Sequence, residues 1–456
     1  MLVADIPTPP KRVSLALLRR NGRPDLLEVS MRGLIAPLAA CCLLTVAACT
    51  DATSVAPLSS PKALATKTAV EPTGPWAKIV EGSTGPGSLY GIYVPNNWNG
   101  DVIYFVHGIR PPTEPVSLPD DPTDWDGFIL IRDQFGAMGF AVAYSSFSEN
   151  GLALKDAAQR THQLRGLVAS VLNGQPNRSF IVGYSLGAAS ALQLIETQSA
   201  QYDGAVMACG MLGGTPMQFQ YIGDVRALFD FYYPGVLPGD VNNVPEGFQP
   251  TLAQVTAIVQ QAVASNPLGL LAIASTAQTP LAFVPGNVTV PGASQTTLVT
   301  SLVVALYYQL IGTEDVVSRT HGHPPYANTE VTYTLGTAVV PPLAPVLANA
   351  IAASNAGVKR YTSPIDAQNL LAKYYVPTGD LNFPVITVHN RWDYLVPYFH
   401  EGVFQGTVQA TGATNNLLQR TVLDFGHCAN PAFRNAVVQS VQDLVGWVTT
   451  GVKPAS

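Results

Sequence analysis

Hydrophobic residues over much of the chain alternate between short apolar runs and longer segments with apolar positions at helical spacing. The runs are dense in β-branched and aromatic residues, which is typical of buried strands. They occupy residues 91–95, 101–107, 140–145, 180–182 and 204–209. Segments 126–138 and 155–172 lie between these runs and fit helices. Strands that alternate with helices predict a mostly parallel sheet covered by helices on both faces.

The strand pattern fades between about residues 215 and 380. Helical segments separated by prolines take its place, at 251–264, 297–311 and 342–354. An insertion of this length between two strands is too long for a loop. We therefore predict that 215–382 is a mainly helical lid.

The alternation of strands and helices resumes near the C-terminus. Apolar runs at 384–389 and 421–423 predict two further strands, and 431–447 predicts a closing amphipathic helix. The predicted α/β core is therefore divided between 76–214 and 383–456.

The N-terminal part carries the features of an export signal. Residues 34–48 are almost wholly apolar, with Arg32 just upstream and small residues before Cys49. The run is too short for a comfortable membrane span and fits the apolar region of a signal peptide. Its last residues, Val-Ala-Ala-Cys, resemble a bacterial lipobox, in which the cysteine is lipidated. We expect a cell-envelope lipoprotein anchored through Cys49, with plain secretion as the alternative.

The region before the predicted core divides into a leader and a tether. The leader covers 1–49, and its signal proper covers 31–49 because Met31 stands where an ordinary signal peptide would begin. Residues 50–75 are rich in Ala, Thr, Ser and Pro without periodicity, which predicts a flexible tether. The mature domain is expected to work outside the cytoplasm, attached to the membrane only through its lipidated cysteine.

The composition supports a large core and excludes one class of partner. The chain has 456 residues, of which 47% are hydrophobic and only 12% are charged, with a net charge of −6. This supports a large buried core. A nucleic-acid-binding protein usually shows a basic stripe or a strongly basic balance, and neither is present in the sequence. We therefore expect no nucleic-acid partner.

The segment Gly183-Tyr184-Ser185-Leu186-Gly187 is the first candidate for chemistry. A nucleophilic serine must lie at the tip of a sharp turn from a strand to a helix. Glycines flank such a turn because the backbones pass too close for side chains. The five-residue pattern alone is weak, but here an apolar strand precedes it and an alanine-rich helix follows. We therefore predict that Ser185 is a nucleophile.

A serine hydroxyl is a poor nucleophile near neutral pH and needs a base to take its proton. The sequence has seven histidines. His427 follows the last predicted strand and precedes the closing helix, which places it at the same sheet edge as the serine. His321 and His323 could hint at a metal pair, but they have no third ligand nearby and prolines follow. We predict His427 as the base and no metal site.

The base must be oriented by a buried carboxylate, which also stabilises the imidazolium. Asp393 lies in a short turn after the predicted strand at 384–389, at the edge where His427 is expected. Asp380 precedes its strand and Asp424 ends one, so both are weaker candidates. We predict Asp393 as the acid.

Two backbone N–H groups are candidates for binding the oxyanion of a tetrahedral intermediate. One belongs to Leu186, the residue after the nucleophile. The second is expected at Ile109, because Gly108 lets the chain turn directly after an early strand.

The predicted mature domain contains Cys209 and Cys428. In an oxidising compartment two cysteines can form a disulfide, and two separate buried thiols are the alternative.

These motifs together resemble those of bacterial exported α/β-hydrolases of the serine esterase and peptidase type. The resemblance rests on four segments of the two predicted core regions. They are 95–100 leading into His107-Gly108, 183–187, 384–397, and Gly426-His427-Cys428. It implies an α/β-hydrolase fold, the Ser–Asp–His triad named above and no cofactor. The segments say little about the predicted lid, which lies before the strand that carries the catalytic Asp.

The resemblance also bears on the cysteines, because some related groups carry a disulfide near the catalytic histidine. A Cys209–Cys428 bridge would brace the His427 loop. The sequence departs from a tannase-like pattern, however, because Tyr184 rather than a cysteine precedes Ser185. We therefore infer no tannase or feruloyl-esterase substrate.

The expected activity is hydrolysis of a carboxylic ester, small or polymeric, through an acyl-enzyme. Aromatic residues of the predicted lid either pack it or form an apolar ester pocket. These residues are Phe229, Phe231, Tyr232, Tyr233, Tyr307 and Tyr308. A serine exopeptidase is the first alternative, and it would need an acidic cluster in the lid, where Glu314-Asp315 is the only adjacent acidic pair. A non-catalytic surface-binding lipoprotein on the same scaffold is the second.

Overall fold

The computed structural model describes residues 68–70, 74–122, 127–284, 293–336, 343–428 and 430–455. The predicted leader, Cys49 and most of the predicted tether lie outside these ranges. All described residues belong to one unit of the chain, Ala63–Ser456, so the strands and the inserted helices share it.

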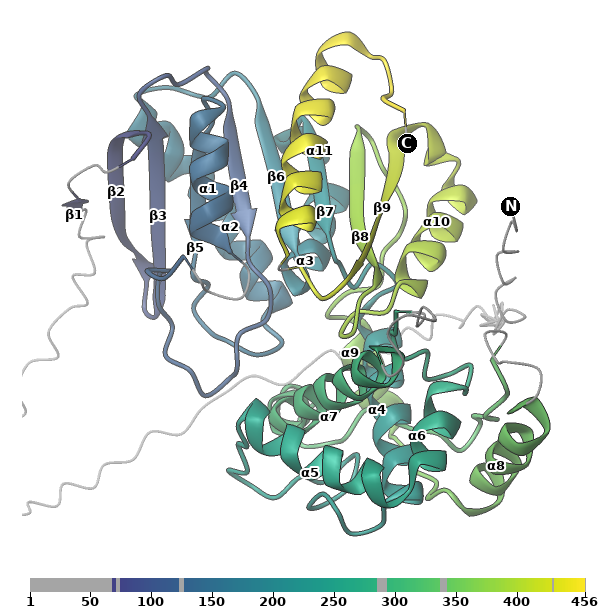
Figure 1. Ribbon diagram of the computed structural model, residues 1–456. Coiled ribbons are helices and arrows are strands. Elements are labelled where there is room, and N and C mark those ends of the chain that lie inside the picture. Colours follow the sequence, from purple (N-terminus) through teal and green to yellow (C-terminus); the bar gives the residue numbers. More distant parts are fainter. Residues whose placement is uncertain are drawn as a thin grey trace, which may run out of the picture. The chain divides into compact units, whose positions relative to one another are not determined.

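The centre of the fold is a nine-stranded sheet with the order β1-β2-β3-β5-β4-β6-β7-β8-β9. Its strands are β1 (Thr68–Val70), β2 (Trp76–Gly85), β3 (Ser88–Pro95), β4 (Val102–Val106), β5 (Ala141–Ser145), β6 (Ser179–Tyr184), β7 (Gly204–Ala208), β8 (Val385–Trp392) and β9 (Leu417–Phe425). The pairs from β1 to β5 are antiparallel, and all pairs from β5 to β9 are parallel. This is the strand order of the α/β-hydrolase fold, so the predicted fold class is confirmed (Figure 1).

Alternate residues of each central strand face opposite sides of the sheet, because side chains in a strand repeat with a period of two. In β4, Val102 and Tyr104 join one apolar cluster, whereas Ile103 and Phe105 join another. Both faces are therefore buried, as expected for parallel strands.

Helices cover these two apolar faces. On the first face lie α2 (Leu154–Leu172), α3 (Leu186–Thr197) and α10 (Phe399–Thr411), and on the second lie α1 (Phe128–Ala137) and α11 (Pro431–Thr450). Short 3-10 turns, η1 (Ser199–Gln201) and η3 (Ala413–Asn416), precede β7 and β9. The sheet is thus sandwiched between helices in the region that carries the predicted serine, aspartate and histidine (Figure 1).

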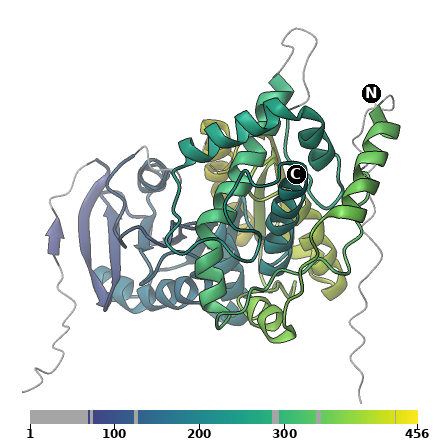
Figure 2. The same ribbon diagram turned by 90° about the horizontal axis from the view of Figure 1, so that it is seen from below.

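The segment between β7 and β8 is helical in its described parts. It forms α4 (Thr215–Tyr232), α5 (Leu252–Ser265), α6 (Pro267–Ala274), α7 (Ala293–Arg319), α8 (Ala344–Gly357) and α9 (Ile365–Ala372). These helices build an apolar cluster of their own, in which Val225, Val259 and Leu302 are fully buried. Figures 1 and 2 show most of them gathered at one end of the sheet.

Helix α7 is the main core helix of this insertion. By length and composition, Gln295–Arg319 is the one helix of the described ranges that could cross a membrane, but 56% of its apolar window is buried in the protein. Leu302, Ala305 and Leu306 of α7 belong to the insertion's own cluster. Packing inside the domain therefore accounts for its apolar character.

Among the strands and α-helices of the two predicted core regions, the sequence analysis did not predict β2 and α10. β2 is half-exposed and contains glycine and serine, so it lacks the continuous apolar run of the central strands. α10 carries Gly402 and Gly406, and its buried residues include the polar His400 and Glu401. Glycine lowers helix propensity and the buried polar residues weaken the amphipathic pattern, so this helix was missed.

The insertion depends on one fully buried guanidinium. Arg226 of α4 bonds to Asp230 (Nε–Oδ1 2.7 Å), to the Gln309 side chain of α7 (2.8 Å) and to the Pro238 carbonyl (3.0 Å). We expect Arg226→Met to lower the free energy of unfolding by about 3 kcal/mol, because it leaves buried acceptors unpaired. Denaturant unfolding followed by circular dichroism measures this loss.

Lys359→Met is the matched control for Arg226→Met. Lys359 pairs with Asp240, but its side chain is 64% exposed, so its loss should cost less than about 1 kcal/mol. Equal losses in the two variants would contradict the structural role given to Arg226.

Candidate active site

Ser185 occupies a strained turn between β6 and α3. β6 ends at Tyr184 and α3 begins at Leu186, so one residue makes the turn. Its backbone has φ 55° and ψ −120°, a conformation that residues other than glycine rarely adopt. A strained serine at a strand-to-helix turn is the geometry of a nucleophile elbow.

The glycines on either side of this turn are required by close backbone contacts. A Cβ added to Gly183 would lie 2.5 Å from the Gly187 carbonyl oxygen. One added to Gly187 would lie 2.1 Å from the Val106 carbonyl oxygen and 2.3 Å from that of His107. Because these are backbone atoms, they cannot move aside cheaply. The Gly-x-Ser-x-Gly pattern is therefore a packing requirement in this fold.

The predicted serine, histidine and aspartate form one hydrogen-bond chain. Ser185 Oγ lies 2.8 Å from His427 Nε2, and His427 Nδ1 lies 2.7 Å from Asp393 Oδ2 and 3.0 Å from Oδ1. The carboxylate accepts from Nδ1–H, which leaves Nε2 to accept the serine proton. These residues come from three separate places in the chain, the ends of β6, β8 and β9.

Asp393 is held rigidly as an acceptor. Its Oδ1 accepts the backbone N–H groups of Leu395 and Val396, both at 2.9 Å. Burial raises the pKa of Asp393, but the charge of His427 and hydrogen bonds from His389 and His427 outweigh it and hold the pKa well below its usual range. The carboxylate is therefore ionised wherever His427 can act as a base.

The rival acids of the sequence analysis do not reach the base. Asp380 is exposed, and Asp424 is half-buried with its Oδ1 bonded to the Phe425 N–H (2.7 Å). Asp393 is the acid that the structure brings to His427.

The two N–H groups predicted for the oxyanion lie on segments that pack together. Leu186 is the first residue of α3, where N–H groups have no acceptor within the helix. Ile109 follows β4, and the close contact of Gly187 with the Val106 and His107 carbonyls places this loop against the start of α3. The His107 ring stacks on Phe147, with 3.8 Å between ring centroids, and its Nδ1 bonds to the Gly108 carbonyl (2.7 Å), so it packs the loop.

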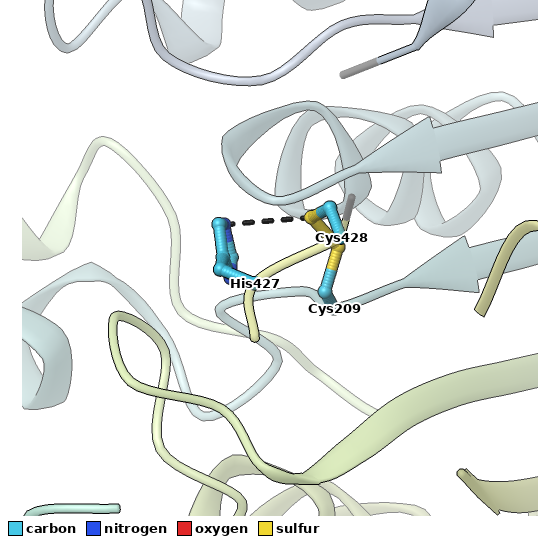
Figure 3. A group of neighbouring side chains, drawn as sticks. All are labelled: Cys209, His427 and Cys428. Carbon is cyan, nitrogen blue, oxygen red and sulfur yellow. Dashed lines mark hydrogen bonds between the residues drawn. A yellow bond between two sulfur atoms is a disulfide. The ribbon is translucent and has the colours of Figure 1, made fainter. Parts of the chain in front are cut away.

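A disulfide joins Cys209 and Cys428 next to this chain of hydrogen bonds (Figure 3). Cys209 follows β7 and Cys428 follows His427 directly, with its Sγ 3.4 Å from His427 Nε2. Both sulfur atoms are buried. In the ranges that the structure describes, these three residues are the one cluster with the spacing of metal ligands, but the sulfurs are consumed by the disulfide. The bridge ties the His427 loop to the end of β7.

Two buried histidines near Asp393 have no assigned role in the sequence analysis. His389 lies in β8, with Nε2 3.4 Å from Asp393 Oδ2, and its Nδ1 lies 3.1 Å from Glu401 Oε1. His400 accepts the Gly213 N–H at Nδ1 and bonds to Gln218 through Nε2. Glu401 and His400 could not be recognised from the sequence because α10 was not predicted. Only the position of His389, four residues before Asp393, could have drawn attention.

No protein-family model and no curated protein sequence matches the chain. Its structure is similar to feruloyl esterase B from Aspergillus oryzae (15% identity, 83% of this chain and 81% of that chain, TM-score 0.42). It is also similar to Candida antarctica lipase A (16% identity, 83% and 78% covered, TM-score 0.39) and to the rice cell wall degrading esterase LipA from Xanthomonas oryzae (13% identity, 82% and 88% covered, TM-score 0.37). Similarities this distant carry no argument about activity, and the fold is assigned from the strand order.

The disulfide is expected to contribute substantially to stability, because it closes a loop between residues 219 positions apart. We expect a Cys209→Ala/Cys428→Ala double variant to lose about 4 kcal/mol of unfolding free energy, measured in urea. A dithiol reductant should destabilise the wild-type protein similarly and leave the double variant unchanged. Thiol titration checks that the wild type is fully reduced. A fully reduced wild type with unaltered stability would contradict this expectation.

Proposed function

We propose that the protein is a serine hydrolase that cleaves carboxylic esters through an acyl-enzyme, with Ser185 as nucleophile, His427 as base and Asp393 as the acid. The observation that carries the proposal is the continuous hydrogen-bond chain from Ser185 Oγ through His427 to a buried Asp393. Fold alone implies no activity, but this set of groups has the geometry of a catalytic triad.

In the acylation step, His427 Nε2 takes the Ser185 proton as Oγ attacks the ester carbonyl carbon. The Asp393 carboxylate stabilises the resulting imidazolium and holds its ring in place. The oxyanion accepts hydrogen bonds from the N–H groups of Leu186 and Ile109. His427 then protonates the departing alkoxide, and the acyl group remains on Ser185.

Deacylation reverses these roles. His427 takes a proton from water, whose oxygen attacks the acyl carbon, and the carboxylic acid leaves as Ser185 recovers its proton. Every proton transfer passes through His427 Nε2, so the proposal requires neither a metal nor a cofactor.

The insertion between β7 and β8 is proposed to act as a lid. Ser185 is 2% exposed and His427 is 4% exposed, so an ester must gain access by movement of covering segments. Most of the aromatic residues considered for an ester pocket pack the insertion itself, as Phe229 and Tyr233 do. Tyr308 instead packs against the apolar cluster of the sheet, which makes it the best of the set for contact with an acyl group.

The peptidase alternative receives no support from the acidic pair in the insertion. Asp315 bonds to Arg319 (2.8 Å) and to the Leu152 N–H (2.7 Å), so its carboxylate is already paired. Glu314 accepts the Gly247 N–H at 3.4 Å. An exopeptidase needs an acidic group that can bind a free amino group.

We also propose that the protein works outside the cytoplasm, anchored through a lipidated Cys49. The buried Cys209–Cys428 disulfide supports export, because structural disulfides persist mainly in oxidising compartments.

The proposed activity is tested by hydrolysis of p-nitrophenyl acetate and butyrate by the mature domain. Ser185→Ala should abolish turnover, because no other group can form the acyl-enzyme, and an aminoacyl-anilide should not be cleaved by either protein. Anilide cleavage by the wild type would favour the exopeptidase. No turnover of any substrate would favour a binding protein.

The assignment of the acid is tested by Asp393→Asn, with Asp424→Asn as the matched control. We expect Asp393→Asn to lower kcat by about 10⁴-fold, because the amide cannot stabilise the imidazolium and favours the wrong tautomer. Asp424→Asn should retain wild-type kcat, since its side chain does not reach His427. Similar losses in both variants would contradict the assignment. Steady-state kinetics on p-nitrophenyl butyrate gives both values.

A further inference from the structure

A second histidine–carboxylate pair lies directly behind Asp393. His389 and Glu401 are both buried, and the His389 ring lies between the Glu401 and Asp393 carboxylates. His389 Nδ1 lies 3.1 Å from Glu401 Oε1, and Nε2 lies 3.4 Å from Asp393 Oδ2 and 2.9 Å from the Val396 carbonyl oxygen. The proposed triad is therefore continued into the core by two further titratable groups.

The hydrogen bonds place one proton on His389 Nε2 and a second between Nδ1 and Glu401. A carbonyl oxygen can only accept, so Nε2 must donate to Val396. On the other side, Glu401 Oε2 accepts from Thr387 Oγ1 and Gln419 Nε2, both at 2.6 Å. These two donors occupy Oε2, so Oε1 is the oxygen that faces Nδ1 of His389, and a proton on Nδ1 is donated to it. A ring that donates from both nitrogens is an imidazolium.

The electrostatics of the pair agree with this count. Burial lowers the pKa of His389, but hydrogen bonds and charges from Asp393 and Glu401 outweigh burial and raise the pKa to about 10. The neighbouring His400 is different, because burial and the charge of His389 lower its pKa to about 3. Of these two buried histidines on adjacent elements, His389 therefore favours the protonated form and His400 the neutral form.

The surroundings of His389 contain few other charges. The Tyr398 ring meets it edge-on at 5.8 Å between centroids, and the Arg391 guanidinium lies 4.7 Å from the centroid of that same tyrosine. Tyr221 of α4 and Tyr394 face Asp393, and burial raises the pKa of both, so they stay neutral. The charges that decide the state of this region are those of Asp393, Glu401, His389 and His427.

We propose that the Glu401–His389 ion pair is a positioning unit that fixes the Asp393 carboxylate and limits the negative charge that His427 meets. The proposal rests on the function proposed above. With the imidazolium in place, Asp393, Glu401 and His389 together carry one negative charge, which one protonated His427 neutralises. Without the His389 cation, the negative charges of the two buried carboxylates would together favour the protonated form of His427.

His389→Gln tests this role, because glutamine removes the cation and retains a hydrogen-bond donor. We expect the acidic limb of the kcat/KM profile to move to higher pH by about one unit, since His427 is more easily protonated. The double variant Glu401→Gln/His389→Gln restores the single negative charge and should bring the limb back toward the wild-type position. A merely structural role for His389 would not produce this recovery.

His400→Gln is the matched control, because His400 is equally buried and adjacent to Glu401 but neutral. It should leave the acidic limb where it is in the wild type. The proposal is overturned if His389→Gln leaves the limb unmoved, or if His400→Gln moves it as far.

A measurement without turnover separates this proposal from the proposed function. In ¹⁵N-histidine-labelled Ser185→Ala protein, both ring nitrogens of His389 should stay protonated from pH 6 to 8, with the signal assigned by its loss in a Ser185→Ala/His389→Gln variant. A neutral His389 at pH 7 overturns the ion pair whether or not the wild type cleaves esters. Failure of the wild type to cleave any ester, with a protonated His389, would reject the proposed function instead.

Discussion

The site depends on keeping the ionised Asp393 carboxylate inside the protein. A buried charge is tolerated only when it is paired and hydrogen-bonded. Asp393 meets this condition through two backbone N–H groups at Oδ1 and the rings of His427 and His389 at Oδ2. His427 extends this arrangement toward Ser185, and His389 and Glu401 extend it into the core. β8, α10 and the loop after β9 thus supply His389, Glu401 and His427 to this buried network.

The sheet supplies the positions that the charge requires. Because β6, β8 and β9 are parallel, their carboxyl ends lie at one edge, and the turns after them carry Ser185, Asp393 and His427. Strand β7 lies between β6 and β8 and ends at Ala208, so the Cys209–Cys428 disulfide fastens the last of these turns to the middle of the sheet. The insertion begins at this same edge, after β7, and returns to the sheet at β8.

Much of the fold was predictable because its signals are local. The central strands are continuous apolar runs. The glycines at 183 and 187 mark a turn whose two flanking positions have no room for a side chain. In the core, β2 and α10 were missed because their local signals are weak. β2 is partly exposed, and α10 turns polar His400 and Glu401 inward, where hydrophobic periodicity predicts apolar residues. Glu401 contacts His389, which lies beside Asp393, and this arrangement is visible in the folded structure but not in the hydrophobic pattern of the sequence.

The sequence by itself determined the alternation of strands and helices, the turn at Ser185, and the residue types able to act as nucleophile, base and acid. These follow from short-range rules of backbone geometry and side-chain chemistry. Only the tertiary structure decided that Asp393 rather than Asp424 reaches His427, that Cys209 and Cys428 are joined, and that His389 lies between the Asp393 and Glu401 carboxylates. Those outcomes depend on distances between residues far apart in the chain, and on the removal of water around them, which no local pattern encodes.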